Sequence, residues 1–262
     1  MIETARFEAR RRARRAVAVG VVMAGLVALV VAMFPSIRET EGIDEFAEDL
    51  PDALSAALGG EVAMGTIEGF LIIEIYRVTW MLILGAYFAY ASAGFVAGEV
   101  DRGSIELTLM NPIRRRRVVV EKFLSAVPDT VIVSLMTFAT VVVTLPLIDE
   151  SVNLSNLVVL HVVATVYLLA CVALGLLVST IISDEGRAQV AGFGLLAGMY
   201  IIEAVTRDTD YEWMSIVMIP RYFDPNTILI DGEVDTTETL VLVLMTVALV
   251  WLAAVVFERA DL

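Results

Sequence analysis

Six long apolar stretches constrain the fold of this chain more than any other feature of its sequence. They cover residues 16–34, 78–97, 124–148, 156–182, 188–202 and 239–257. A helix needs about 20 mostly apolar residues to cross a bilayer. The stretch from residue 188 is short for this, so we expect it to extend to residue 206 or to be completed by another element. The pattern predicts an all-α integral membrane protein with six transmembrane helices in a single domain, residues 1–262.

Composition supports a chain that has lipid as part of its solvent. Hydrophobic residues make up 58% of the chain and charged residues 19%, against roughly 45–50% and 25% in soluble domains. The net charge of −14 excludes a protein held to nucleic acid by an overall positive field. An acid-rich chain with one lysine also suggests an organism that lives in high salt. The single cysteine, Cys171, excludes an internal disulfide.

The basic residues are distributed unevenly between the connections. Fourteen of the 18 lie before the first stretch, between the second and third, between the fourth and fifth, or after the sixth. Because basic connections stay in the cytoplasm, we expect both termini to be cytoplasmic and the protein to lie in the plasma membrane. The arginine-rich segment before residue 16 reads as an amphipathic helix on the inner membrane surface.

The connections on the opposite side are acidic and contain short elements. Apolar residues at helical spacing predict an amphipathic helix over about 43–58. Between the fifth and sixth stretches, a short apolar segment broken by Pro220 and Pro225 is expected to dip into the outer leaflet without crossing it. Glu74, Arg77 and Glu203 are expected to lie near the outer boundary and to reach water.

The connection between the second and third stretches carries the most specific pattern. Glycines and an Asn-Pro turn surround a short apolar helix, and four arginines follow it. The ordered residues are Glu99, Gly103, Ser104, Glu106, Leu107, Leu109, Pro112, Arg114 and Lys122.

This ordered set resembles the cytoplasmic signature of the ABC-2 family, the permease subunits of ATP-binding-cassette exporters. The resemblance departs at Glu121, where the family often has glycine. It implies a coupling helix over about 98–110, seated in a groove of a cytoplasmic ABC ATPase. It also implies a substrate path between two permeases, either a homodimer or a pair of related chains. Glu99 and Glu106 are candidates for charged ATPase contacts, and ordinary solvated carboxylates are the alternative.

The chain itself offers no nucleotide-binding loop. A Walker loop needs Gly-Lys followed by Ser or Thr, and the only lysine, Lys122, lies between Glu121 and Phe123. We therefore expect no cofactor, metal or catalytic residue in this chain, with ATP and Mg²⁺ bound by a separate ATPase.

Several polar and small residues within the stretches are functional candidates. Lys122 and Asp129 lie two helical turns apart on one face, where they would bracket an inner gate or lie at headgroup depth. Arg114 and Arg115 are expected to contact lipid headgroups. His161 is either a ligand or proton relay, or a packing residue. The pairs Gly94/Gly98 and Gly194/Gly198 permit close helix approach, within the chain or between two copies.

Two other classes of function stay open. One is a membrane scaffold or assembly factor that does not transport. The other is an ion-coupled secondary transporter, for which carboxylates near the bilayer midplane and internal repeats would be expected. The substrate is not decided by the sequence.

Overall fold

The computed structural model describes residues 2–38, 65–103, 115–207 and 209–259, with side chains from residue 13 onward. Every regular element within these ranges is helical. The elements in chain order are α1 (Ile2–Arg38), α4 (Ile67–Leu71), η1 (Ile72–Leu84), α5 (Gly85–Asp101), α7 (Arg115–Thr144), η2 (Leu145–Ile148), α8 (Leu154–Ile181), α9 (Glu185–Thr206), η3 (Glu212–Val217), η4 (Ile219–Tyr222), η5 (Thr227–Asp231) and α10 (Thr236–Arg259).

Six helices of the described chain are long and apolar enough to span a membrane, as predicted. They cover Ala13–Arg38, Ile67–Asp101, Arg115–Ile148, Leu154–Ile181, Glu185–Thr206 and Thr236–Arg259. The fifth helix does extend to Thr206, so it is long enough to span a membrane although its apolar stretch is short. The second begins 11 residues earlier than predicted, at Ile67 instead of residue 78. The polar residues Glu74 and Arg77, which bounded the apolar stretch in the sequence, are part of the continuous helix.

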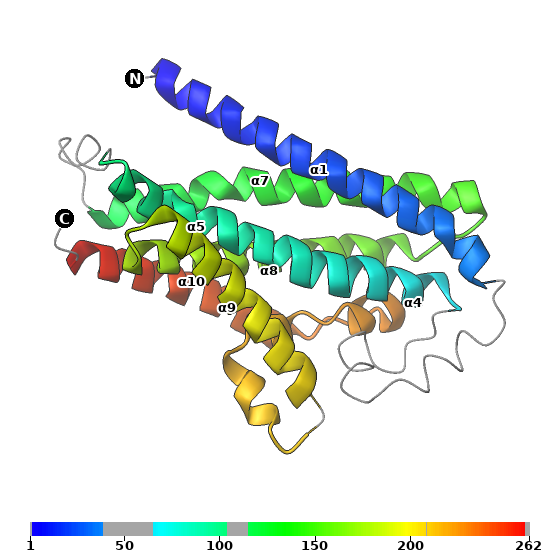
Figure 1. The fold of residues 1–262 in the computed structure, drawn as a ribbon. Coiled ribbons are helices and arrows are strands. Elements are labelled where there is room, and N and C mark those ends of the chain that lie inside the picture. Colours follow the sequence, from blue (N-terminus) through cyan, green and yellow to red (C-terminus); the bar gives the residue numbers. More distant parts are fainter. Residues whose placement is uncertain (1, 39–64, 104–114, 208, 260–262) are drawn as a thin grey trace.

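One end of the bundle carries most of the described basic side chains. Figure 1 shows that α1 begins, α5 ends, α7 begins and α10 ends at this side, which we call the basic end. The start of the first helix and the finish of the last thus share a side, as an even number of crossings requires. The sequence charge bias is therefore matched by the geometry of the bundle.

The second and fourth spans form the centre of the bundle. Their apolar windows are 78% and 67% buried, against 28% for α1, α7 and α10. Helix α5 packs along α8 and α9, while α1 packs along α7. Close approach of α5 to α8 depends on Gly175, where a Cβ would lie 2.0 Å from the carbonyl oxygen of Ala89. The outer faces of α1, α7 and α10 are left apolar and exposed, as lipid contact requires.

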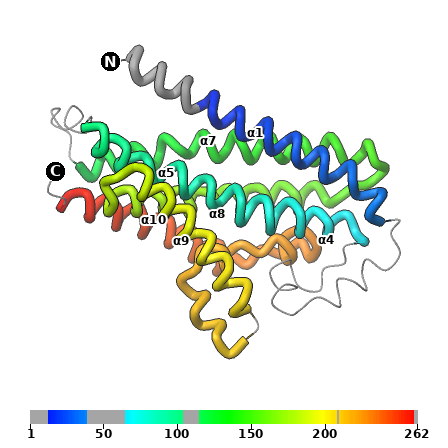
Figure 2. The backbone as a smooth tube through the Cα atoms, viewed as in Figure 1, coloured from blue at the N-terminus to red at the C-terminus, as the bar shows by residue number. Residues whose placement is uncertain are grey.

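The N-terminal basic segment forms the first part of α1 and continues into the span without a break. Figure 2 shows the following part of α1, drawn in blue, running along α7. The helical structure of the basic segment was expected. Contact of this segment with the membrane surface stays a prediction.

The end of the bundle opposite the basic end is built from short elements. The helices η3, η4 and η5 connect α9 to α10, and prolines 220 and 225 lie among them, as the broken apolar segment predicted. In Figure 1, η3 folds back beside the end of α9, away from the bundle. The predicted amphipathic helix over 43–58 lies outside the described residues.

The expectation that Arg77 and Glu203 reach water was wrong. Arg77 is only 2% exposed and Glu203 4%, while Glu74 is exposed as expected. Arg77 Nη2 lies 3.3 Å from Asp224 Oδ1, and Arg207 pairs with both Glu203 and Asp224. The segment before η5 and the end of α9 cover the second span here, so the charges are paired inside the protein.

Candidate functional site

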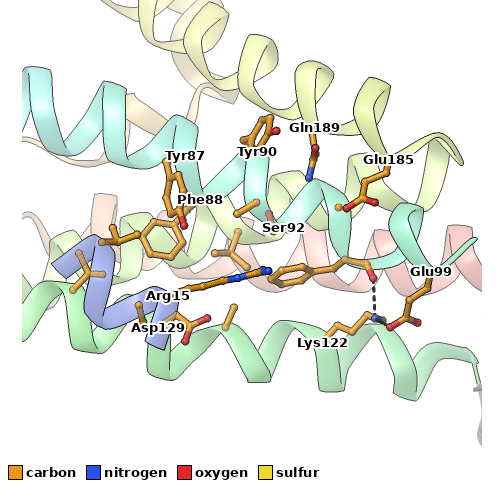
Figure 3. Close-up of a pocket in the computed structure, with 18 of the residues that line it drawn as sticks. Arg15, Tyr87, Phe88, Tyr90, Ser92, Glu99, Lys122, Asp129, Glu185 and Gln189 are labelled. Carbon is orange, nitrogen blue, oxygen red and sulfur yellow. Dashed lines mark hydrogen bonds and ion pairs between the residues drawn. The ribbon is translucent and has the colours of Figure 1, made fainter. Parts of the chain in front are cut away.

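A cavity of about 710 Å³ lies at the basic end of the bundle. Its walls come from α1, α5, α7, α8 and α9 (Figure 3). This volume falls within the roughly 300–1,000 Å³ range of small-molecule sites. Tyr87 and Tyr90 on its wall are 37% and 40% exposed, so the cavity communicates with the surroundings.

An ion pair across the cavity joins α7 to α5. Lys122 Nζ lies 2.5 Å from Glu99 Oε1 and donates a hydrogen bond of 2.8 Å to the carbonyl oxygen of Phe95. The lysine side chain is 11% exposed and the carboxylate 28%. Of the residues in the predicted signature, these are the two that the structure brings together. In this structure the Glu99 carboxylate pairs with the third span, and its role as an ATPase contact stays a prediction.

A second charged pair joins the same end of α5 to the start of α9. Arg102 Nη1 lies 2.6 Å from Glu185 Oε2. Asp184 caps α9 by accepting a hydrogen bond of 2.7 Å from the backbone N–H of Arg187, which orients the first turn. Glu185 and Arg102 therefore close the cavity on the side facing α9.

The glycine pair in α5 places α9 side chains over the cavity. A Cβ at Gly94 would lie 2.8 Å from Gln189 Nε2, and one at Gly98 would lie 2.7 Å from Glu185 Cδ. The predicted close helix approach at Gly94 and Gly98 is thus confirmed within one chain. By contrast, a Cβ at Gly194 or at Gly198 of α9 would meet nothing within 4 Å.

Asp129 lines the cavity together with Lys122, as their shared helical face predicted. Figure 3 shows Arg15 reaching into the same cavity from α1, on the side where Asp129 projects from α7. Tyr87 lies within electrostatic reach of both Arg15 and Asp129. An inner gate formed by Lys122 and Asp129 stays a prediction.

The described part of the coupling segment belongs to the membrane helix. Residues 98–101 form the last turn of α5, and the predicted coupling helix beyond Gly103 lies outside the described residues. The chain leaves α5 at Gly103, whose φ of +66° is readily adopted only by glycine. Arg115 begins α7. The other signature residues lie outside the described residues: Ser104, Glu106, Leu107, Leu109, Pro112 and Arg114.

Sequence reasoning missed the hydroxyl side chains of the cavity (Tyr87, Tyr90 and Ser92) and four of its charged or amide side chains: Arg15, Arg102, Glu185 and Gln189. The arginines were counted only as charges that set membrane orientation. The signal for Glu185 and Gln189 was their four-residue spacing on α9, which matches the spacing of Gly94 and Gly98 on α5. The equal spacing becomes informative only when the structure shows that α9 is the helix that packs against Gly94 and Gly98 of α5.

His161 lies in a different part of the bundle, among aromatic side chains. It is 5% exposed, and its Nδ1 lies 3.0 Å from the carbonyl oxygen of Leu157. Its ring meets Tyr76, Trp80 and Phe138 edge to face, with centroids 5.3–5.8 Å apart. This environment favours the packing role over a ligand role.

The comparison with known families decides the identity of this bundle. A family profile described as "ABC-2 family transporter protein" matches residues 5–262. The chain belongs to the ABC-2 family. This ABC-2 permease is therefore a multi-pass transport protein, and the match confirms the resemblance read from the segment between its second and third spans. Comparisons with curated proteins and with solved structures found no match.

Proposed function

We propose that this chain is the permease subunit of an ABC exporter in the plasma membrane, with both termini in the cytoplasm. Two separate ABC ATPase subunits would bind ATP and Mg²⁺ and drive it. The observation that carries the proposal is the family match over residues 5–262. The basic end supports the orientation, because positively charged connections are retained in the cytoplasm.

The proposed force path starts in the connection between α5 and α7. Glu106, Leu107 and Leu109 are the proposed ATPase contacts, and Gly103 and Arg115 bound their connection. Both ends of the connection continue into spans that the Lys122–Glu99 pair ties together. A push on the connection would therefore move α5 and α7 as one unit, and motion of packed helices is how a permease alternates its pathway.

The proposed dimer contact lies on α9. Gly194 and Gly198 face open space, whereas Gly94 and Gly98 are covered by Glu185 and Gln189 of the same chain. Small residues on an exposed span let a second helix approach closely. We assign this α9 face to a second copy of the permease or to a related permease. Gly194→Ile should lower the crosslinked dimer fraction at least fivefold, while Leu195→Ile, on exposed α9 surface about 100° around the helix from Gly194, should leave it unchanged.

Purification of the tagged permease from its own membranes tests the exporter assignment. We expect an ATPase to co-purify and the complex to hydrolyse ATP. Glu106→Ala and Leu107→Ala should lower the ATPase content at least fivefold, and Arg187→Ala, in the first turn of α9 at the basic end, should not. A permease that transports normally with no associated ATPase would be a secondary transporter. Retained ATPase with no transported substrate would indicate an assembly factor.

A further inference from the structure

The charges that line the cavity at the basic end are balanced. The lining contains three basic and three acidic side chains: Arg15, Arg102, Lys122, Glu99, Asp129 and Glu185. Opposite charges meet within this lining, as in the pairs of Lys122 with Glu99 and of Arg102 with Glu185. A lining of this kind exerts no net field that favours a purely anionic or purely cationic ligand. It can pair with both ends of a dipolar one.

The cavity lies at the depth of lipid headgroups. Residues 16–37 of α1 and 130–148 of α7 are free of charge, and these stretches begin immediately after Arg15 and Asp129. The hydrocarbon boundary therefore passes close to both residues. Lys122 precedes Asp129 by seven residues, or about 10 Å of helix rise toward the basic end. The cavity thus spans a distance comparable to the headgroup layer, and its walls are formed by protein helices.

Aromatic side chains complete the deep end of the cavity. Tyr87, Phe88 and Tyr90 line it together with Arg15 and Asp129, and Tyr87 is within electrostatic reach of both charges. Aromatic faces and a carboxylate together suit an ammonium group, and an arginine suits a phosphate. Figure 3 shows these groups arranged around one space.

We propose that this cavity binds the headgroup of a zwitterionic amphiphile, which carries one phosphate and one ammonium on an apolar tail. Arg15 contacts the phosphate, and Asp129 with Tyr87 contacts the ammonium. The tail leaves the cavity toward the membrane beside the partly exposed Tyr87 and Tyr90. That the bound amphiphile is also exported rests on the proposed function. Its binding in the cavity is independent of that function.

The proposal is tested by measuring ligand binding to the full-length permease in nanodiscs whose bilayer lipid carries no charged group. The probes are lysophosphatidylethanolamine, lysophosphatidylglycerol with the same tail, and tail-free glycerophosphoethanolamine. We expect the zwitterionic lysolipid to bind at least tenfold more tightly than either of the others. Asp129→Asn and Arg15→Gln should each weaken it about tenfold, since a charge-assisted contact is worth about that much.

Two further variants guard against effects on folding. Tyr87→Leu keeps an apolar side chain at a partly exposed position and should weaken binding about threefold. Glu150→Gln, far from the cavity in the Arg38–Glu150 pair, should change it less than twofold. Equal binding of both lysolipids, or full binding by Asp129→Asn and Tyr87→Leu, would overturn the proposal. So would equal binding of glycerophosphoethanolamine, which would make the ligand a soluble compound. No ATPase or ATP takes part, so failure here leaves the exporter assignment intact.

Discussion

Lys122 Nζ and Glu99 Oε1 lie 2.5 Å apart, on helices that are separated in the chain by residues 102–114. The pair holds the two ends of that connection together, because Glu99 lies near the end of α5 and Lys122 near the start of α7. The lysine is the more buried partner, with 11% of its side chain exposed. Loss of the ion pair should therefore cost more free energy through the buried lysine than through the carboxylate, which is 28% exposed and can be solvated by water.

Glu99→Gln should therefore destabilise the permease by about 2 kcal/mol, since it removes the carboxylate that pairs with the partly buried Lys122. Thermal unfolding in detergent measures the change. Glu121→Gln is the matched control, because Glu121 is 54% exposed in its pair with Arg117 and should change stability by less than about 0.5 kcal/mol. Equal effects of the two substitutions would contradict a structural role for the Lys122–Glu99 pair.

Asp224→Asn should destabilise the opposite end of the bundle by about 2–3 kcal/mol. The reason is that Arg77, 2% exposed, has Asp224 as its ion-pair partner, and Arg207 shares the same carboxylate. Glu212→Gln is the comparison, since Glu212 is 51% exposed in its pair with Arg221. Unfolding midpoints of both variants decide the point, and an Asp224→Asn midpoint no lower than that of Glu212→Gln would refute it.

Two glycine substitutions should differ sharply in effect. Gly175→Ala would place a Cβ 2.0 Å from the Ala89 carbonyl oxygen, and the resulting separation of α5 from α8 should cost about 3 kcal/mol or more. Gly194→Ala meets nothing within 4 Å and should be neutral or stabilise the helix by up to about 1 kcal/mol. The yield of folded protein in detergent and its unfolding temperature report both. Similar yields for the two would show that α5 and α8 do not pack this closely.

Asp235 should make the start of α10 sensitive to acid. Its Oδ1 accepts hydrogen bonds from the backbone N–H groups of Thr237 and Glu238, at 2.7 and 3.1 Å. These bonds lower the pKa of the carboxyl, with that of Glu238 contributing most. A lowered folded-state pKa means that the stabilisation is complete above the ordinary value of about 3.9 and is lost as pH falls through the lower folded value.

Hydrogen exchange of the first turn of α10 measures this effect. Amide protection at Thr237 and Glu238 should be constant from neutral pH to about pH 4 and should fall at lower pH. Asp235→Asn retains an acceptor oxygen without a titrating group, so its protection should not change with pH in this range. Asp235→Ala should lose protection at every pH. A pH-dependent Asp235→Asn variant would assign the effect to another residue.

The six spans, the shared side of the chain ends and the ABC-2 family could be read from the sequence. Apolar length and the density of arginine are properties of contiguous residues, and a bilayer responds to them one segment at a time. The fifth span shows the limit of this reasoning. Its continuation past Glu203 depends on Arg207 and Asp224, which pair the charges that would otherwise oppose burial.

Tertiary structure alone decided how the polar residues are used. Arg77 and Asp224 are 147 positions apart in the chain, so no local pattern links them, and Arg77 alone reads as a residue at the membrane boundary. The cavity likewise combines Arg15, Glu99, Asp129 and Gln189 from four helices. Each residue taken singly is an ordinary polar group near the end of a span. Only helix packing brings them within reach of one ligand, because ionic and hydrogen-bonding contacts act over a few ångströms and depend on distances that sequence spacing does not encode.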